Sequence, residues 1–292
     1  MATEGEGDLL TRLRRASAHL SPGHQRIAAY VASSPHDAAF ESAARIAARC
    51  GVSESSVVRF AAAVGYDGFP ALSQALQAIV KGHLSLPQRM MHHRPRELAA
   101  DAPADELLRD ALDLAAANVA AAARTLDVAA FEATLAAILD ARTVYAVGLR
   151  GSAHLAALAA VLLGKAGADA RALTCGDVTL FDDLRSVGPG DAVVAFSFAR
   201  YTRRAVEALR LARERGATTI AVTDAPLTPA ASVAEHVLVV PVASHAFNHS
   251  YVAAVALIDA LVLGWTTRAE ARTLASLEAF ERVLPTGDLM VP

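Results

Sequence analysis

Two short segments of this chain combine small residues, hydroxyl groups and an arginine. Residues 148–152 have the sequence Gly-Leu-Arg-Gly-Ser, and residues 197–202 have the sequence Ser-Phe-Ala-Arg-Tyr-Thr. Hydroxyls and backbone N–H groups donate hydrogen bonds to phosphate oxygens, and a guanidinium adds a bidentate, charge-assisted pair. Both segments therefore predict an anion-binding site. The candidate ligand-binding residues are Gly148, Arg150, Ser152, Ser197, Arg200 and Thr202.

The surrounding sequence alternates between apolar stretches of strand character and amphipathic stretches of helix character. This pattern predicts a parallel sheet of about five strands covered by helices on both faces. Ligands of such sheets lie beyond the carboxyl ends of the strands, where helix N-termini favour anions. An alternative role for Ser152 and Thr202 is to cap the helices that follow, and capping is compatible with anion binding. The predicted strands are 143–147, 170–173, 192–196, 218–222 and 237–242; the predicted helices are 106–126, 128–141, 153–166, 178–184, 202–215 and 251–264.

Two enzyme classes are disfavoured by the same loops. Arg150 stands where a dinucleotide-binding loop has its second glycine, and no acidic residue ends the second predicted strand. Ser197 lacks the flanking glycines of a hydrolase nucleophile elbow. His245 and His249 precede the last predicted helix and are candidates for acid–base chemistry, but no glutamate accompanies them. We therefore predict no catalytic residues and no cofactor, and the protein is not expected to be an enzyme.

Residues 42–69 near the N-terminus predict two short helices joined by a tight turn. Ser42 is placed to cap the first helix, and Gly51 stands where a left-handed residue ends one. Ser53 is placed to cap the second helix, whose apolar residues recur at helical spacing from 57 to 64. This organisation is typical of a helix-turn-helix.

The opposite face of the second helix carries Ser55, Ser56 and Arg59. Serines near a helix N-terminus suit phosphates or base edges, and an arginine one turn later can form two hydrogen bonds with guanine. The candidate DNA-binding residues are therefore Ser53, Ser55, Ser56 and Arg59. The alternative is a generic three-helix scaffold in which the serines only cap.

Charge is distributed unevenly along the 292 residues, although the net charge is only −3. Residues 9–96 hold 11 Lys and Arg against four Asp and Glu, whereas residues 97–292 hold 16 against 23. A basic front half is consistent with a polyanionic partner, and equally with a solvated basic surface. We expect DNA to contact the front half.

Residues 82–105 contain three prolines and mixed charge without sustained periodicity, which predicts a linker. Its arginines Arg89, Arg94 and Arg96 are candidates for additional DNA phosphate contacts or for a soluble hinge. The adjacent histidines at 92 and 93 have no third ligand nearby, so we predict no metal site. The expected organisation is a DNA-binding domain at 1–81, a linker at 82–105 and a ligand-binding domain at 106–292.

The N-terminus is acidic and no apolar run reaches the length of a membrane span, so we expect no membrane partner. Cys50 and Cys175 fall in different predicted domains without metal-ligand spacing, which favours reduced thiols. We expect the protein to be cytoplasmic.

The string IAARCGVSESSVVRFAAAVGYDGFPAL resembles the N-terminal domain of RpiR/MurR-type bacterial transcriptional regulators. Residues 143–265 resemble the sugar isomerase (SIS) domain, through strings such as VYAVGLRGSAHLAALAAVLLGKAG. The resemblance implies an all-α helix-turn-helix domain followed by a three-layer α/β/α domain. It also implies phosphosugar binding through the hydroxyls of Ser152, Ser197 and Thr202. Ala199 and Arg200 depart from the common SIS loop sequence, which leaves the identity of the ligand open.

These observations predict a DNA-binding regulator whose operator affinity changes when a phosphosugar-like metabolite binds. The alternative is a phosphosugar isomerase with an added helical domain. Helix-turn-helix proteins usually read paired DNA half-sites, and the resemblance implies that SIS domains associate through helices that flank the sheet. Both favour a homodimer or homotetramer. The candidate contact surfaces are residues 105–141 and 251–280.

Overall fold

The computed structural model describes residues 20–33, 38–39, 41–83, 86–93, 101–226 and 228–283. The chain divides into two units, of which the first runs to Ser85 and includes residues 227–229, and the second comprises the remaining residues. A helix predicted to end near His19 lies outside the described residues.

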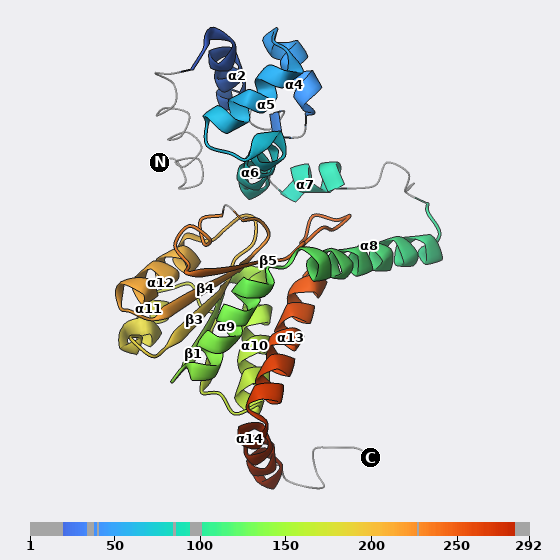
Figure 1. Cartoon of the computed structure of the whole chain (residues 1–292). Coiled ribbons are helices and arrows are strands. Elements are labelled where there is room, and N and C mark those ends of the chain that lie inside the picture. Colours follow the sequence, from blue (N-terminus) through green and yellow to red (C-terminus); the bar gives the residue numbers. More distant parts are fainter. Residues whose placement is uncertain are drawn as a thin grey trace. The chain divides into compact units, whose positions relative to one another are not determined.

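The second unit is built on five apolar stretches that pair as parallel strands in the order β2-β1-β3-β4-β5 (Figure 1). The strands are β1 (Val144–Gly148), β2 (Ala170–Leu173), β3 (Ala192–Phe196), β4 (Thr218–Thr223) and β5 (His236–Val239). All five correspond to strands predicted from the sequence. The central strands β1 and β3 are buried along their whole length because helices cover both faces.

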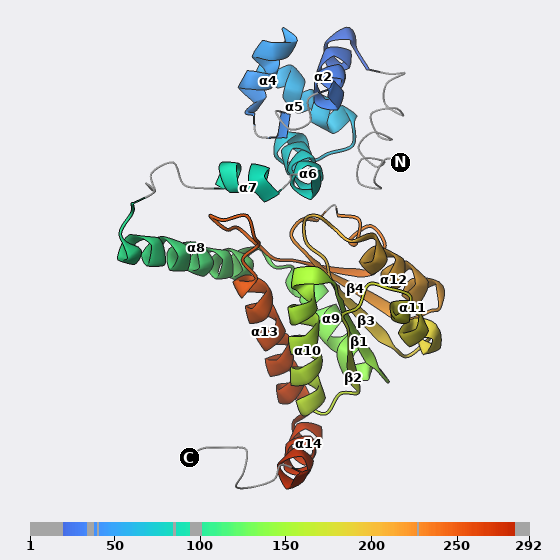
Figure 2. The same ribbon diagram turned by 180° about the vertical axis from the view of Figure 1, so that it is seen from behind.

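Alternate residues of each strand face opposite layers of helices. Val144 and Ala146 of β1 belong to the hydrophobic core beneath α9 (Val128–Asp140), α10 (Ala153–Lys165) and α13 (Val252–Arg268). Tyr145 and Val147 belong to the core beneath α11 (Thr179–Asp183) and α12 (Arg203–Glu214). The predicted three-layer α/β/α fold is therefore confirmed, and Figure 2 shows the same layers from behind.

Two further helices of this unit lie outside the layers around the sheet centre. Helix α8 (Ala104–Thr125) precedes α9 and packs on α13, and α14 (Glu270–Val283) follows α13. The last helix predicted from the sequence is the apolar stretch 251–264. The helix continues to Arg268, and α14 then turns back to contact α10.

The register of the sheet places the two candidate loops next to each other. Gly148 at the end of β1 pairs with Phe196 at the end of β3, so the segments that follow both strands leave the sheet side by side. Because the strands are parallel, both segments emerge at the carboxyl edge, and helices α10 and α12 begin directly after them.

The first unit consists of helices packed around a separate core. The helices are α2 (Pro22–Ser33), α4 (Ala43–Cys50), α5 (Glu54–Ala63) and α6 (Gly68–His83). The core contains Ile27 from α2, Ile46 from α4, Phe60 from α5 and Leu76 from α6. The predicted helix-turn-helix is therefore present as α4 and α5.

Part of the segment predicted as a linker is helical. Helix α7 (Leu86–His93) belongs to the second unit, although its sequence shows no sustained apolar periodicity. Within the described ranges, no single helix is long and apolar enough to cross a membrane. Only two pairs bent by 90° and 105°, α8 with α9 and α13 with α14, reach the required length and composition together.

Candidate functional site

Side chains hold the turn of the helix-turn-helix as the sequence predicted. The Ser42 hydroxyl accepts a hydrogen bond from the Arg45 amide at 3.3 Å, and the Ser53 hydroxyl accepts one from the Ser56 amide at 3.3 Å. Gly51 ends α4 with a φ of 61°, in the left-handed region that favours glycine. Arg26 of α2, which the sequence analysis did not single out, donates to the carbonyl oxygens of Cys50 and Gly51 at 2.8 and 3.1 Å. It thereby satisfies the C-terminal carbonyls of α4.

The outer face of α5 carries the polar residues predicted to contact DNA. Ser55 and Arg59 are exposed and Ser56 is partly exposed, whereas Val57 and Phe60 on the opposite face are buried. The Ser53 hydroxyl lies 3.0 Å from that of Ser55 and 2.9 Å from that of Ser56. The Arg59 guanidinium donates to the Ser56 hydroxyl at 3.2 Å. The four candidate residues therefore form one connected polar surface at the start of α5.

Val58 adds an apolar group to this face of α5 and was not predicted to be functional. Its side chain is 45% exposed and lies between the polar positions in the sequence. A valine methyl suits contact with the thymine methyl group in a major groove. The exposed surface of α5 thus offers both polar and apolar contacts.

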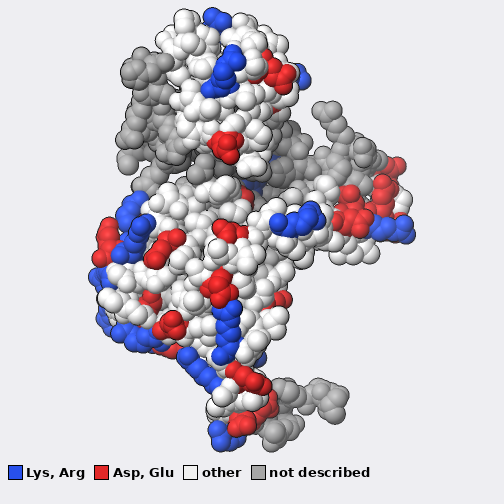
Figure 3. Space-filling view, viewed as in Figure 1, with Lys and Arg blue, Asp and Glu red and all other residues white. Residues whose placement is uncertain are grey.

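The basic charge of the front half is only partly visible on the described surface. Arg12, Arg14, Arg15, Arg94 and Arg96 lie outside the described residues. Figure 3 shows few charged side chains on the helical unit and interspersed basic and acidic side chains on the second unit. Among the described residues, the exposed face of α5 therefore supports DNA binding more directly than net charge does.

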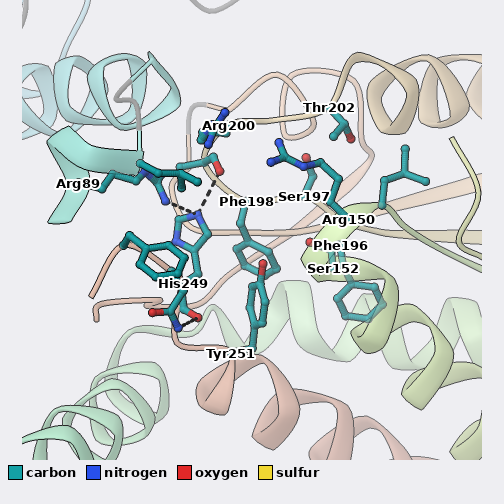
Figure 4. Close-up of a pocket in the computed structure, with 16 residues that line it drawn as sticks. Arg89, Arg150, Ser152, Phe196, Ser197, Phe198, Arg200, Thr202, His249 and Tyr251 are labelled. Atoms are coloured by element: carbon teal, nitrogen blue, oxygen red, sulfur yellow. Dashed lines mark hydrogen bonds between the residues drawn. The ribbon is translucent and has the colours of Figure 1, made fainter. Parts of the chain in front are cut away.

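Five of the six candidate ligand-binding residues line one cavity of about 290 Å³ in the second unit (Figure 4). They are Arg150, Ser152, Ser197, Arg200 and Thr202. Gly148 lies beneath them at the end of β1. A side chain there would overlap the carbonyl oxygen of Ser152, so glycine lets this loop fold back closely over the strand.

The backbone of both loops is strained at its arginine. Arg150 has a φ of 58° and Arg200 a φ of 66°, and these are the two non-glycine residues with left-handed φ among those described. Such conformations cost about 1–3 kcal/mol and concentrate at functional sites, where the surrounding structure imposes them. Here the strain turns each chain sharply between a strand and the following helix.

The loop after β3 is fixed by three contacts. The Ser197 amide donates to the Val222 carbonyl at 2.9 Å, and the Tyr201 hydroxyl donates to Asp224 Oδ1 at 3.0 Å. The Ala199 carbonyl lies 3.0 Å from His249 Nε2. Burial and the neighbouring Asp224 carboxylate raise the pKa of Tyr201, so this tyrosine remains a neutral donor.

The hydroxyls at the start of α10 and α12 do not cap these helices. Neither Ser152 nor Thr202 makes a side-chain capping hydrogen bond, so the capping alternative is wrong for both. Ser197 is 3% exposed, and its hydroxyl has no hydrogen-bond partner among the residues that the structure describes. Buried hydroxyls are normally satisfied. This one therefore indicates a position for a polar ligand atom.

Aromatic side chains form one wall of the cavity. The ring centroid of Phe198 lies 5.4 Å from that of Tyr251 and 6.4 Å from that of His249. Tyr251 also packs closely over Gly151, where a methyl group would meet its hydroxyl at 2.7 Å. Burial raises the pKa of Tyr251, while a hydrogen bond with Ser152 acts in the opposite direction. Both loops are thus supported by the segment that precedes α13.

The structure places four further polar residues in the cavity that sequence reasoning did not assign to a ligand: Arg89, Asn248, His249 and Tyr251. Three of them belong to the polar cluster Asn248-His249-Ser250-Tyr251 before the last helix, which was the available signal in the sequence. No sequence signal linked Arg89 to the cavity. Its predicted contact with DNA phosphates is wrong, because its side chain is 2% exposed and lines the cavity.

The two histidines considered for acid–base chemistry lie in different surroundings. His245 Nε2 is 3.2 Å from Asp110 Oδ2 of α8, whereas His249 lies in the cavity. No Asp or Glu is among the described residues that line the cavity. In the described part of the chain, no group of three His, Cys, Asp or Glu side chains is placed to hold a metal ion.

We expect Gly148→Ala to lower the midpoint of thermal unfolding, because the added methyl group would displace the loop at Ser152. Overpacking of this kind costs about 1–3 kcal/mol. Gly164→Ala on α10 is the matched control, since its methyl group would meet no atom within 4 Å. A glycine in a helix interior costs up to about 1 kcal/mol relative to alanine, so this control should unfold at a higher temperature. Equal midpoints for the two variants would contradict the close packing inferred at Gly148.

The chain matches two family models. The model described as "Helix-turn-helix domain, rpiR family" matches residues 7–81, and the model described as "SIS domain" matches residues 137–264. The two matches cover the first unit and the sheet of the second unit.

Known proteins with similar sequences or structures include regulators of this architecture. The HTH-type transcriptional regulator YbbH of Bacillus subtilis is 27% identical over 90% of this chain and 91% of its own length. The sugar isomerase domain of an RpiR transcription factor from Sphaerobacter thermophilus is 31% identical, with a TM-score of 0.60, over 61% of this chain and 99% of that one. The NanR protein of Vibrio vulnificus, in complex with ManNAc-6P, is 21% identical with a TM-score of 0.54, over 94% of this chain and 97% of that one. The chain therefore belongs to the RpiR family of helix-turn-helix transcriptional regulators, with a SIS domain as its second unit.

Proposed function

We propose that this protein regulates transcription in response to an anionic sugar metabolite. Helix α5 contacts operator DNA, and the cavity at the carboxyl edge of the sheet binds a phosphosugar or a related anion. The observation that carries the proposal is the buried Ser197 hydroxyl, which has no partner among the described residues and lines a cavity together with Arg150 and Arg200.

The cavity has the groups that a phosphate requires. Guanidinium groups and hydroxyls donate charge-assisted hydrogen bonds to its oxygens, and the N-termini of α10 and α12 begin at the two loops. The aromatic wall of Phe198 and Tyr251 provides an apolar surface for the carbon side of a sugar ring. The ManNAc-6P bound by NanR supports a phosphosugar as the class of ligand.

The cavity does not favour isomerase activity. Aldose–ketose isomerisation requires a general base placed beside the sugar, and no carboxylate is among the described lining residues. His249 Nε2 lies within hydrogen-bond distance of Arg89 and of the Ala199 carbonyl, and in either tautomer it bonds to one of them. We therefore propose a regulator without enzymatic activity. Interconversion of a phosphoaldose and a phosphoketose by the purified protein would overturn this part of the proposal.

DNA recognition is expected to involve two copies of the chain. Helix-turn-helix proteins usually read paired half-sites, so a homodimer or homotetramer would present two copies of α5. Leu108 and Leu112 of α8 are each 60% exposed, which supports residues 105–141 as one contact surface between copies. Sedimentation that gives a monomer at working concentration would contradict the expected assembly.

The experiment that tests the proposed function is selection of genomic DNA fragments bound by the full chain, repeated with each member of a phosphosugar panel. We expect one set of fragments to share a near-symmetric site, and one phosphosugar to change their recovery. Recovery of random sequence would refute specific DNA binding. A shared site that no phosphosugar affects would refute phosphosugar control.

A further inference from the structure

Arg89 joins the ligand cavity from a part of the chain outside the SIS sheet. It lies on α7, which begins three residues after α6 of the DNA-binding unit ends at His83. Although α7 is next to the DNA-binding unit in sequence, it belongs to the second unit. The Arg89 side chain points to His249, and both line the cavity together with Arg200 (Figure 4).

The contact between Arg89 and His249 competes with the contact between His249 and the Ala199 carbonyl. His249 Nε2 lies 2.9 Å from Arg89 Nη1 and 3.0 Å from the Ala199 carbonyl oxygen. The arginine side chain only donates hydrogen bonds, so its bond to His249 requires an unprotonated Nε2. The Ala199 carbonyl only accepts, so its bond to His249 requires a protonated Nε2. A single imidazole nitrogen cannot satisfy both at once. If Arg89 moves away, His249 can still donate to Ala199, so the departure leaves the ring with a partner.

The charges around Arg89 favour an anionic ligand. Its guanidinium is buried and is repelled by that of Arg200, and the carboxylate that acts on it is Asp224, which already accepts a hydrogen bond from Tyr201. Burial lowers the pKa of Arg89; the Asp224 carboxylate raises it and Arg200 lowers it. An anion in the cavity would interact favourably with the guanidinium groups of Arg89 and Arg200 together.

We propose that Arg89 binds the anionic group of the ligand and thereby transmits the state of the cavity to the segment that leads to the DNA-binding unit. The inference rests on the proposed function and adds the route of regulation. In this structure Arg89 contacts His249; with an anion bound it would contact the anion instead, and His249 would donate to Ala199. A ligand shifts a conformational equilibrium only through contacts that differ between the two states. The exchange of partners by Arg89 is such a difference, and it lies on the connecting segment.

The first test measures binding of inorganic phosphate to the full chain by calorimetry at constant ionic strength. We expect Arg89→Ala to weaken phosphate binding about 10-fold or more, because a charge-assisted hydrogen bond is lost. Arg89→Lys should bind with intermediate affinity, since lysine keeps the charge without the planar fork. Arg109→Ala, which removes an exposed arginine of α8, should bind like the wild type. Thermal unfolding and circular dichroism of the unliganded variants verify that each is folded.

The second test follows hydrogen exchange of the α7 amides with and without phosphate. Phosphate should change their exchange in the wild type and in Arg109→Ala, but not in Arg89→Ala. Phosphate binding that is equal in Arg89→Ala and the wild type would overturn the inference. The inference would also be overturned if saturating phosphate left hydrogen exchange of the α7 amides unchanged in the wild type.

A third variant separates failure of this inference from failure of the proposed function. If Ser197→Ala with Thr202→Ala loses phosphate binding while Arg89→Ala keeps it, the cavity is the ligand site but Arg89 is not part of it. If the wild type binds no phosphate at all, both the proposed function and the role of Arg89 are refuted.

Discussion

Replacing Ser197 and Thr202 together by alanine is expected to abolish the effect of the phosphosugar on DNA binding. An effector coupling of about 1–3 kcal/mol changes DNA affinity roughly 5–150-fold in the wild type, and the double variant should show no change. Ser197 has a buried hydroxyl without a partner among the described residues, and Thr202 does not cap α12. Both hydroxyls are thus available to the ligand. A titration of operator binding against phosphosugar concentration measures the response.

The double variant is informative because the Ser197 hydroxyl has no partner among the described residues and the Thr202 hydroxyl does not cap α12. DNA affinity without ligand and thermal stability should therefore stay close to wild type. Thr218→Ala is a suitable control, since Thr218 begins β4 at the opposite edge of the sheet. A full response in the double variant would rule out the two loops as the effector site.

Replacing Arg59 by alanine is expected to weaken specific operator binding by about 1–3 kcal/mol, or roughly 5–150-fold. Arg59 is exposed on α5 one turn after Ser55 and Ser56, where a guanidinium can reach a base edge in the major groove. Its hydrogen bond to Ser56 orients the side chain before DNA binds. Fluorescence anisotropy with an operator fragment and with an unrelated fragment measures specific and non-specific affinity.

Arg45→Ala is the matched control for charge. Arg45 lies on α4, its side chain is 71% exposed and it pairs with Glu41. Loss of a positive charge that contacts only the phosphate backbone weakens binding to all DNA sequences alike. It also reduces the slope of log affinity against log salt concentration by about one. Arg59→Ala should instead reduce the preference for the operator. Equal losses on both DNA fragments would show that Arg59 contacts only phosphates.

Local signals in the sequence were sufficient to predict the helix-turn-helix, the sheet and the position of the two loops, but not α7 or α14. Ser42, Gly51 and Ser53 mark the ends of α4 and α5 because capping depends on residues within one turn. The central strands β1, β3 and β4 were predictable because buried parallel strands are short apolar runs. Once the sheet was predicted to be parallel, the loops after β1 and β3 had to share an edge.

The contributions of Arg89 and Arg26 could not be predicted in this way. Arg89 meets His249 across 160 residues of sequence, and no periodicity of either segment encodes that meeting. Arg26 binds the carbonyls that end α4, which depends on how α2 packs rather than on its own sequence. The capping alternative for Ser152 and Thr202 failed for a related reason. The residue type shows that a serine or threonine is able to cap a helix. The direction of the Ser152 and Thr202 hydroxyls depends on the strained turns at Arg150 and Arg200.

Control of DNA affinity by a ligand in the SIS cavity is tested most directly by one comparison of affinities. The affinity of the full chain for a selected operator fragment is measured by fluorescence anisotropy, with and without the phosphosugar that alters recovery in the selection. We predict a change of about 5–150-fold that disappears in Ser197→Ala with Thr202→Ala. An affinity that is the same with and without phosphosugar, at concentrations where calorimetry shows the cavity to be saturated, would contradict it.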